Sequence, residues 1–287
     1  MQISGRTRIV GIIGDPVAHS LSPAMHNAAF RALDLDFAYV AFPVRVARVA
    51  DALNGIRALD IAGVNVTVPH KERVVAWLDS VSPTARRAGA VNTIVQRNGR
   101  LHGENTDVRG FQRALAGAKF RVRGCQAVIV GAGGVARAAL TALLDGGARH
   151  VTVANRTVAR ARRLARTAHA AAARTSAVSL AALEERSVLR TADVIVNATS
   201  VGLHGERFFP LAYHATPPSC LFVDLIYGRR TDFLVRAGRA RRRTLDGSDM
   251  LVHQGAAAFT MWTGQAAPVA VMKAALRAAG RHRSRSS

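Results

Sequence analysis

Cysteine is scarce in this chain of 287 residues, which contains only Cys125 and Cys220. Two cysteines so far apart provide neither a disulfide framework nor a cysteine-rich metal cluster. The histidines do not suggest a metal site either, because no two of them stand at a ligand spacing beside a carboxylate. The sequence therefore predicts no metal. The histidines considered are His19, His26, His70, His102 and His253.

Long apolar runs are also missing. Apolar residues make up 49% of the chain, but no stretch approaches the roughly 20 residues that span a bilayer. The short apolar run at 9–13 lacks a cleavage-type end, so we interpret it as a strand rather than a signal peptide. We expect a cytoplasmic protein without a membrane partner.

Acidic residues are few, since 18 Asp and Glu stand against 40 Lys and Arg, giving a net charge of +22. This balance favours contact with polyanions and steers anionic ligands toward the protein. However, the arginines are scattered among alanines, and no zinc finger or aromatic-rich binding strand accompanies them. A basic nucleic-acid-binding protein stays open as an alternative, but we expect no specific nucleic-acid partner.

A glycine turn between an apolar run and a helical pattern organises the second half of the chain. The run at 126–130 predicts a strand, and the Ala/Leu-rich stretch at 134–140 predicts a helix. Gly131 would permit the turn, Gly133 would let a pyrophosphate approach the backbone, and Ala136 would let the helix pack on the strand. The helix N-terminus offers N–H groups to a phosphate. The pattern indicates dinucleotide binding by Gly131, Ala132, Gly133, Gly134, Val135 and Ala136.

The end of the next predicted strand, at 150–154, indicates which dinucleotide is bound. NAD sites usually place Asp or Glu there to hold the ribose 2′-hydroxyl. This chain instead has Asn155, Arg156 and Thr157, followed by Arg160. Guanidinium groups bind a 2′-phosphate by charge-assisted hydrogen bonds. The arginines could belong to a solvated face, but their position favours NADP(H) as the cofactor.

The N-terminal part begins with a predicted strand at 8–13 and a loop that leads to a helix. Ser22 followed by Pro23 predicts a helix start, with Ser22 as N-cap and the proline at the first helical position. Ser20 and Ser22 could both hydrogen-bond an anionic oxygen. Equally, Ser22 could serve as a cap alone, with Ser20 an ordinary loop residue.

Lys71 follows a predicted strand at 63–68 whose polar and apolar residues alternate, as in a strand with one face toward a cleft. Residues 69–72 predict a helix start, so Lys71 would lie in its first turn. The helix dipole disfavours a cation there. This is an awkward place for a structural lysine, and it fits one that transfers protons.

Asp107 precedes a predicted helix at 108–116. By residue preference alone, its simplest role is that of an N-cap. Upstream of it, Asn98 and Gly99 predict a hairpin between strands at 91–96 and 100–102.

Strands near 127–130, 150–154, 193–197 and 221–225 alternate with helices, which indicates a parallel doubly wound sheet. The Ala/Arg-rich stretch at 160–179 predicts a helix and loop. The predicted organisation is an α/β substrate-binding domain at 1–107, a Rossmann-type domain at 108–246, helices at 247–280 that return to the first domain, and a disordered basic tail at 281–287.

Several motifs together resemble the shikimate dehydrogenase family, and they occur in order over nearly the whole chain. They include the glycine turn with its Asn155-Arg156-Thr157 extension. The others are GDP at 14–16, HSLSP at 19–23, HN at 26–27, NVTVPHK at 65–71, GAVNT at 89–93, GENTD at 103–107, NATSVG at 197–202, DLIY at 224–227 and MLVHQ at 250–254.

The resemblance implies reversible NADPH-dependent reduction of 3-dehydroshikimate to shikimate, in aromatic amino-acid precursor synthesis. It also implies a two-domain fold with the active site in the cleft and Lys71 and Asp107 as the catalytic pair. Further implied residues are Ser20, Ser22, Asn65, Thr67, Asn92, Tyr227 and Gln254 for the substrate, and Ala198, Thr199, Leu225, Gly247 and Met250 for the cofactor.

Two places depart from the family pattern. Many members carry prolines where this chain has 228–232, and Asp249 stands where glycine is usual. A relative that oxidises quinate, often with NAD, therefore stays open as an alternative. Ser22 in place of threonine favours shikimate, and Arg156 with Arg160 argues against NAD. We expect a monomer or homodimer.

Overall fold

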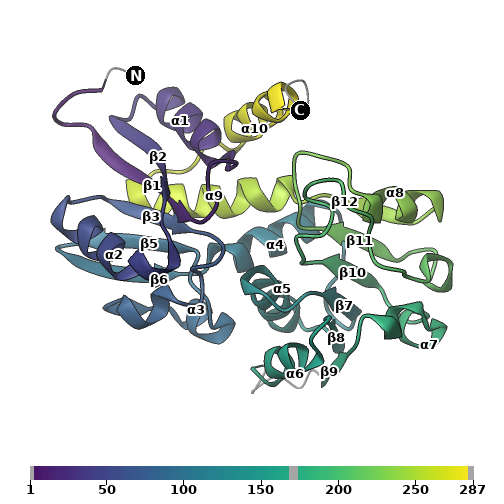
Figure 1. Cartoon of the computed structure of the whole chain (residues 1–287). Helices are drawn as coiled ribbons and strands as arrows, with labels where there is room; N and C mark the ends of the chain where they lie inside the picture. The colour runs from purple at the N-terminus through teal and green to yellow at the C-terminus, as the bar shows by residue number, and fades with distance from the viewer. Residues whose placement is uncertain (1–2, 168–173, 284–287) are drawn as a thin grey trace. The chain divides into compact units, whose positions relative to one another are not determined.

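The computed structural model describes residues 3–167 and 174–283, and the chain divides into two compact units (Figure 1). Unit 1 is Met1–Gly110 together with Val252–Ser287, and unit 2 is Phe111–Leu251. Both divisions fall inside helices, α4 (Thr106–Gly117) and α9 (Ser248–Thr263), rather than at the predicted 107/108 and 246/247. A helix that begins in one unit thus continues into the other.

Unit 1 contains a mixed six-stranded sheet in the order β2-β1-β3-β5-β6-β4. β1 is parallel to both β2 and β3, whereas β5 is antiparallel to β3 and β6. The β5–β6 hairpin turns at Asn98 and Gly99, whose φ values of 51° and 73° suit the tight turn that these residues predicted. The strands are β1 (Arg8–Gly14), β2 (Phe37–Pro43), β3 (Gly63–Val66), β4 (Ser80–Val81), β5 (Thr93–Arg97) and β6 (Arg100–Glu104).

The helices of unit 1 surround an apolar core of small and branched side chains that includes Ile13, Leu53, Val64, Ile94 and Leu101. The C-terminal helix α10 packs on α1 within this unit (Figure 1). The helices are α1 (Ser22–Ala32), α2 (Val49–Ala58), α3 (Pro83–Ala88) and α10 (Val269–Arg283), with 3-10 helices η1 (Val46–Arg48) and η2 (Val74–Trp77).

The start of α1 differs from the prediction that Ser22 caps it. Leu21 occupies the N-cap position, and Ser22 is the first helical residue. The Ser22 N–H donates to Ser20 Oγ at 3.2 Å. The prediction was wrong because the serine two residues upstream, rather than Ser22 itself, satisfies an N–H at this helix end.

Unit 2 contains an all-parallel six-stranded sheet in the order β12-β11-β10-β7-β8-β9. Counted within the unit, this is the 3-2-1-4-5-6 order of the Rossmann fold, with its switch point between β7 and β10. The strands are β7 (Gln126–Val130), β8 (His150–Ala154), β9 (Arg174–Val178), β10 (Val194–Asn197), β11 (Leu221–Asp224) and β12 (Arg243–Leu245).

The sequence did not predict the two edge strands of unit 2, β9 and β12. The predicted helix and loop at 160–179 is wrong for 174–178, which form β9, and 168–173 lie outside the described residues. β9 has no apolar pattern in its sequence and is held by pairing to β8, including a 3.1 Å contact between Thr152 Oγ1 and Ser176 Oγ. An edge strand stabilised this way leaves little signal in its side chains.

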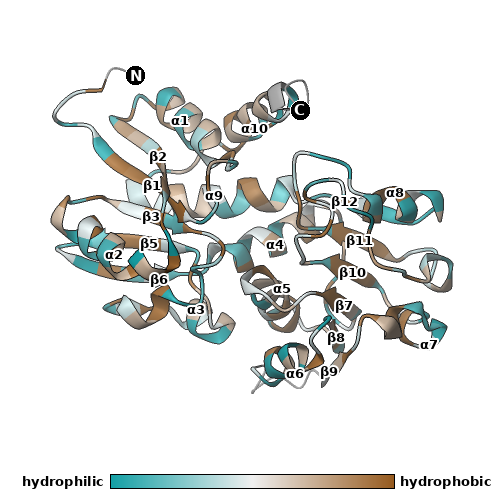
Figure 2. Cartoon of the chain, viewed as in Figure 1, coloured by the Kyte–Doolittle hydropathy of each residue, from teal (hydrophilic) through white to brown (hydrophobic). Residues whose placement is uncertain are grey.

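The core of unit 2 is aromatic on one side of its sheet. Phe208, Tyr213, Phe222 and Phe233 pack with ring centroids 4.6 to 6.2 Å apart. Figure 2 colours β7, β10 and β11 mostly hydrophobic and much of α6 hydrophilic, so the sheet interior and the solvated helix are clearly distinguished. The helices are α5 (Gly134–Asp145), α6 (Val158–Arg166), α7 (Arg186–Leu189) and α8 (Asp232–Arg239), with 3-10 helices η3 (Ala181–Glu184) and η4 (Tyr213–Ala215).

The end of the chain is more regular than predicted. α10 continues to Arg283, so the prediction of a disordered tail is wrong for 281–283. Residues 284–287 lie outside the described residues.

Candidate active site

Lys71 and Asp107 form an ion pair in unit 1, with 2.6 Å from Nζ to Oδ2. Their side chains are only 13% and 7% exposed. Because desolvation offsets much of the attraction between shielded charges, such a pair is a poor device for stability alone. The remaining exposure of Lys71 leaves it within reach of a small ligand.

Lys71 lies on a turn, and the predicted helix start at 69–72 is wrong. The first helical residues after β3 belong to η2 (Val74–Trp77). The carbonyl of Lys71 accepts a 2.8 Å hydrogen bond from the N–H of Val91. This bond joins Lys71 to a neighbouring segment and is not a hydrogen bond within a helix. The helix-dipole argument for Lys71 therefore fails, and the ion pair with Asp107 replaces it as the reason to single out this lysine.

Asp107 is not the cap of α4 either. The helix begins at Thr106 rather than at the predicted 108, and the N–H of Val108 donates to Asn105 Oδ1 at 3.3 Å. Asn105 thus performs the capping that residue preference assigned to Asp107. The Asp107 carboxylate is left for Lys71, in the first helical turn, where negative charge is favoured.

Asn92 is the centre of a buried polar network beside this pair. Its Oδ1 accepts from the backbone N–H of Thr106 at 2.7 Å. Its Nδ2 donates to Thr106 Oγ1 at 3.0 Å and to Gln254 Oε1 at 3.3 Å. The network therefore joins two predicted substrate residues that lie 162 positions apart.

Asn65 on β3 extends the same network. Its Nδ2 donates to the carbonyl of Asn92 at 3.3 Å and to Thr93 Oγ1 at 3.1 Å, and its Oδ1 accepts from the Tyr39 hydroxyl at 2.8 Å. Thr93 Oγ1 in turn lies 3.0 Å from Thr106 Oγ1. Buried amides with this many partners hold one orientation, which is what selective binding of a polar ligand needs.

Ser20, Ser22 and Thr67 come from the segments that follow β1 and β3, two neighbouring parallel strands. The N–H of Thr67 donates to the carbonyl of Ile13 at 2.9 Å, which ties the two strand ends together. Ser22 is buried, and Ser20 and Thr67 are half-buried. Their role toward a substrate stays a prediction, as does that of Tyr227, which belongs to unit 2.

Sequence reasoning missed Tyr39, Thr93 and Thr106 as members of the network. Thr93 and Thr106 stand directly beside the predicted Asn92 and Asp107, so their position was a usable signal. Tyr39 lies within an apolar strand, and nothing in its neighbourhood marks it.

The glycine turn in unit 2 has the backbone geometry that its residues predicted. Gly131 has φ 116°, and a Cβ there would lie 2.7 Å from the carbonyl oxygen of Ala198, so only glycine fits. Gly133 stands directly before α5, which has no side-chain cap, and a Cβ on it would meet nothing within 4 Å. Open space beside uncapped N–H groups suits a pyrophosphate. Ala136 is fully buried, as predicted for close packing of the helix on the strand.

The segment after β8 carries the predicted 2′-phosphate residues. Asn155 Nδ2 donates to the carbonyl of Thr157 at 3.0 Å, which orders the turn into α6. Arg156 and Arg160 are exposed, and within the described part of the chain neither guanidinium has an ion pair or hydrogen bond. Both are available for an anionic ligand.

Asn197 and Asp224 end the neighbouring strands β10 and β11 and are fully buried. Asn197 Nδ2 donates to Asp224 Oδ1 at 3.0 Å, and Asn197 Oδ1 accepts from the Thr199 hydroxyl at 2.7 Å. Burial raises the pKa of Asp224, while hydrogen bonds from Thr231 and other donors oppose that rise. The pair fixes the loop with Ala198 and Thr199 at the end of β10.

Gly247 and Leu225 also lie close together in unit 2. A Cβ on Gly247 would lie 2.5 Å from the Leu225 carbonyl oxygen, and the Gly247 N–H donates to the Ile226 carbonyl at 3.1 Å. Met250 in α9 is 5% exposed. The cofactor contacts of these residues stay predictions.

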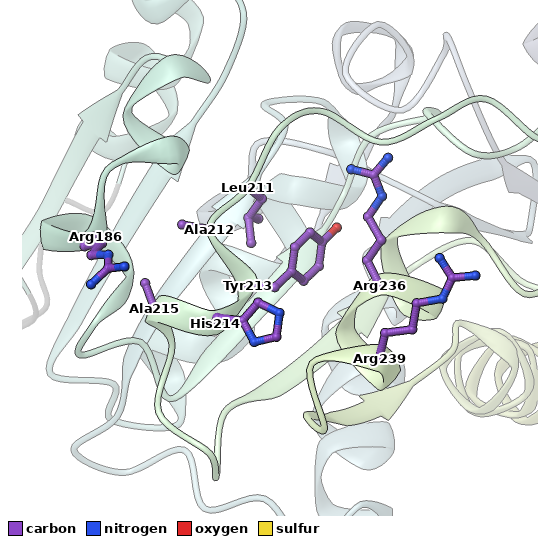
Figure 3. Close-up of a pocket in the computed structure, with 8 residues that line it drawn as sticks. All are labelled: Arg186, Leu211, Ala212, Tyr213, His214, Ala215, Arg236 and Arg239. Atoms are coloured by element: carbon purple, nitrogen blue, oxygen red, sulfur yellow. The ribbon is translucent and has the colours of Figure 1, made fainter.

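A cavity in unit 2 contains none of the predicted site residues (Figure 3). Arg186 lies on the opposite side of it from Arg236 and Arg239, and Arg236 is paired to Asp232 at 2.9 Å. Nothing in it converges on a ligand. It is lined by Arg186, Leu211, Ala212, Tyr213, His214, Ala215, Arg236 and Arg239.

Among residues 3–167 and 174–283, no group of three or more His, Cys, Asp or Glu could hold a metal ion. In the same ranges, every helix is too short or too polar to pass through a membrane. Cys125 and Cys220 are free, and burial raises the pKa of each thiol to about 12.

Three family models match the chain in order. Residues 12–94 match the shikimate dehydrogenase substrate binding domain, and residues 114–229 match shikimate / quinate 5-dehydrogenase. Residues 247–277 match the shikimate 5′-dehydrogenase C-terminal domain.

Relatives and solved structures agree with these matches. The chain is 46% identical over 282 residues to "Shikimate dehydrogenase (NADP(+))" of Moorella thermoacetica, covering 97% of this chain and 96% of the relative. The structure of Listeria monocytogenes shikimate 5-dehydrogenase in complex with shikimate and NAD has a TM-score of 0.89 at 34% identity, covering 96% and 98% of the two chains. That of Thermus thermophilus shikimate 5-dehydrogenase, in complex with NADP(H) and shikimate, has a TM-score of 0.84 at 40% identity, covering 95% and 99%.

Proposed function

This chain belongs to the shikimate dehydrogenase family, and we propose that it catalyses the reversible NADPH-dependent reduction of 3-dehydroshikimate to shikimate, with Lys71 and Asp107 as the catalytic pair. The observation that carries the chemical part of this proposal is the shielded 2.6 Å contact between Lys71 Nζ and Asp107 Oδ2, next to a buried network of amides and hydroxyls. It is the arrangement that a proton-transferring amine beside a polar ligand requires.

Lys71 handles the proton. Bound NADPH supplies the hydride for the carbonyl carbon of the substrate, and negative charge grows on the carbonyl oxygen. As an ammonium group, Lys71 stabilises that oxygen and gives it one proton, so the ketone becomes an alcohol. In the oxidation of shikimate, the neutral amine accepts the hydroxyl proton instead.

Asp107 keeps the reacting nitrogen in place. A carboxylate that accepts from Lys71 Nζ restricts the long lysine side chain to one position, and positioning of this kind lowers the entropic part of the barrier. The cap provided by Asn105 leaves Asp107 free for this task.

The remaining substrate contacts are assigned by the family resemblance. Ser20 and Ser22 would hold the carboxylate of the substrate, whereas the amides of the buried network would bind its hydroxyl groups. The proposed set is Ser20, Ser22, Asn65, Thr67, Asn92, Tyr227 and Gln254.

NADP(H) fits the residues of unit 2. The open space at Gly133 and the uncapped start of α5 would accept the pyrophosphate. The exposed guanidinium groups of Arg156 and Arg160 would bind the 2′-phosphate. The proposed set is Gly131, Ala132, Gly133, Gly134, Val135, Ala136, Asn155, Arg156, Thr157, Arg160, Ala198, Thr199, Leu225, Gly247 and Met250.

Quinate is the second candidate substrate, because the model that matches residues 114–229 describes both acids and because Asp249 departs from the family pattern. Initial rates on shikimate and quinate, each with NADP and with NAD, separate the two. We expect the highest kcat/KM for shikimate with NADP, and a higher value for quinate would assign the chain to the broader relatives.

The catalytic assignment is tested by Lys71→Met, with Lys119→Met as a matched control on an exposed lysine of unit 2. Loss of a general acid typically lowers the rate by about 10²–10⁴-fold. We expect Lys71→Met to lose that much in kcat while it still binds shikimate in calorimetry, and Lys119→Met to keep its activity. Unchanged turnover in Lys71→Met would remove this residue from the mechanism.

The protein is further proposed to act in the cytoplasm, as a monomer or homodimer, without a specific nucleic-acid partner. Its net charge of +22 makes weak contact with polyanions expected. Duplex DNA binding that is tighter than NADPH binding at matched salt would contradict this assignment.

A further inference from the structure

Tyr39 is a buried tyrosine whose hydroxyl donates into the polar network. The side chain is 3% exposed, and its hydroxyl lies 2.8 Å from Asn65 Oδ1. Tyr39 comes from β2 and Asn65 from β3, on opposite sides of β1 in the sheet. The tyrosine therefore reaches across a strand to the amide.

The Asn65 amide can accept one more hydrogen bond, at Oδ1, beyond those it makes with the described residues. Both of its N–H groups have acceptors, the Asn92 carbonyl and Thr93 Oγ1. Its Oδ1 accepts from Tyr39 and keeps a second lone pair. A ligand hydroxyl would therefore meet Asn65 as a donor to Oδ1.

Tyr39 is itself held by two consecutive residues of α1. Asn27 brackets its backbone, since Asn27 Oδ1 accepts from the Tyr39 N–H at 2.8 Å and Asn27 Nδ2 donates to the Tyr39 carbonyl at 3.0 Å. His26 stacks on its ring, with centroids 4.5 Å apart and planes 4° from parallel. Trp262 of α9 also packs near the Tyr39 ring, with the two ring centroids 6.1 Å apart.

We propose that Tyr39 is a positioning residue for the substrate: its hydroxyl fixes the Asn65 amide so that Oδ1 accepts a hydroxyl group of the substrate. The inference rests on the proposed function, because it concerns how shikimate is bound. It adds a residue that the family motifs did not assign, and it gives α1 a second role besides carrying Ser22.

The test is a double-mutant cycle in the full-length protein. Tyr39→Phe removes one hydroxyl and keeps the ring stack. Because the variant loses one hydrogen bond, we expect the KM and the calorimetric Kd for shikimate to rise about 2- to 12-fold. The kcat and the KM for NADP should stay within about twofold, because the lost interaction holds shikimate equally in the ground state and in the transition state.

Asn65→Ala supplies the second arm of the cycle. If Tyr39 acts through Asn65, Tyr39→Phe has no further effect on the shikimate KM in the Asn65→Ala background. Tyr213→Phe is the matched control, since the Tyr213 hydroxyl in unit 2 is buried with no hydrogen-bond partner in the described structure. It should leave both KM values unchanged.

Several results overturn the inference. An equal rise of the shikimate and NADP KM values in Tyr39→Phe marks a general structural defect, and a full effect in the Asn65→Ala background shows that Tyr39 acts elsewhere. If Tyr39→Phe does not fold, Asn27→Ala, which loosens the tyrosine backbone but keeps its hydroxyl, should still raise the shikimate KM alone. A wild-type protein that neither binds nor oxidises shikimate overturns the proposed function together with this inference, whereas an active wild type with an indistinguishable Tyr39→Phe overturns only the inference.

Discussion

The two units build their proposed sites in different ways. In unit 1 the site consists of side chains, nearly all buried and hydrogen-bonded to one another, as in the contacts among Asn65, Asn92 and Thr106. In unit 2 it consists mainly of backbone, a glycine turn and a helix start, with exposed arginines at one end. Side chains can select a polar ligand by its hydroxyl pattern, whereas backbone N–H groups bind any phosphate.

This difference predicts how each site fails. A side-chain network loses selectivity when one member is removed, but a backbone site fails only when the chain path itself changes or the space beside it is filled. The two glycines of the turn in unit 2 allow that distinction to be tested within one loop.

The largest expected effect comes from Gly131→Ala. An alanine at φ 116° with its Cβ 2.7 Å from the Ala198 carbonyl oxygen must shift the backbone, which we expect to destabilise unit 2 by about 2–5 kcal/mol. Gly133→Ala is the matched variant, because its Cβ meets nothing and its φ of −94° suits alanine. It should keep the unfolding temperature and raise the KM for NADPH about tenfold or more, since the methyl group takes the space of the pyrophosphate.

Urea unfolding and NADPH titration of both variants check this prediction. If Gly133→Ala unfolds as easily as Gly131→Ala, or if it binds NADPH like the wild type, the proposed division between a structural glycine and a ligand-facing glycine is wrong.

The same contrast explains what the sequence could predict. The glycine turn was predictable because a local pattern of strand, glycines and helix fixes its geometry, and the parallel sheet followed from alternating strands and helices. In the unit 1 network, Asn65, Asn92 and Gln254 could be named only through the family motifs, and no motif predicted that Asn92 and Gln254 meet across 162 positions of chain. No local preference contains that contact.

The local errors have physical causes of the same kind. Capping preference pointed to Asp107 and Ser22, but Asn105 and Ser20 satisfy the helix N–H groups. The local argument for Lys71 concerned a helix that does not form, so its proposed role is supported by the family motifs and by its contact with Asp107. Here competition between neighbouring polar side chains decided the outcome, and such competition is not visible in single-residue preferences.

Lowering the pH is expected to have an intermediate effect on the free energy of unfolding, and the effect should be confined to unit 1. His26 is fully buried, and burial lowers its pKa from 6.5 to about 3. The unfolded chain therefore binds a proton that the folded chain refuses, so stability is constant above about pH 6.5 and falls as the pH drops toward 3. At pH 5 the loss should be about 2 kcal/mol.

His26→Phe tests this assignment, because phenylalanine keeps an aromatic ring against Tyr39 and cannot be protonated. We expect its urea midpoint to change much less between pH 7 and pH 5 than that of the wild type. Hydrogen exchange at the two pH values should locate the wild-type loss in unit 1. An equal acid sensitivity in the variant would assign the effect to other groups.

The smallest expected effect concerns the one part of the unit 2 site that does consist of side chains. Replacing both Arg156 and Arg160 with alanine should raise the KM for NADPH about tenfold and leave the KM for NADH unchanged, because only NADPH carries the 2′-phosphate. Replacing Arg162 and Arg163 with alanine removes the same charge from α6, which follows Arg156 and contains Arg160. If the high net charge alone attracts the cofactor, both double variants weaken NADPH binding equally, and added salt removes the difference from wild type. If the position of the arginines decides, only the Arg156/Arg160 double variant loses its preference for NADPH over NADH. Arg156 and Arg160 then discriminate between ligands, as the buried amides of unit 1 are proposed to do.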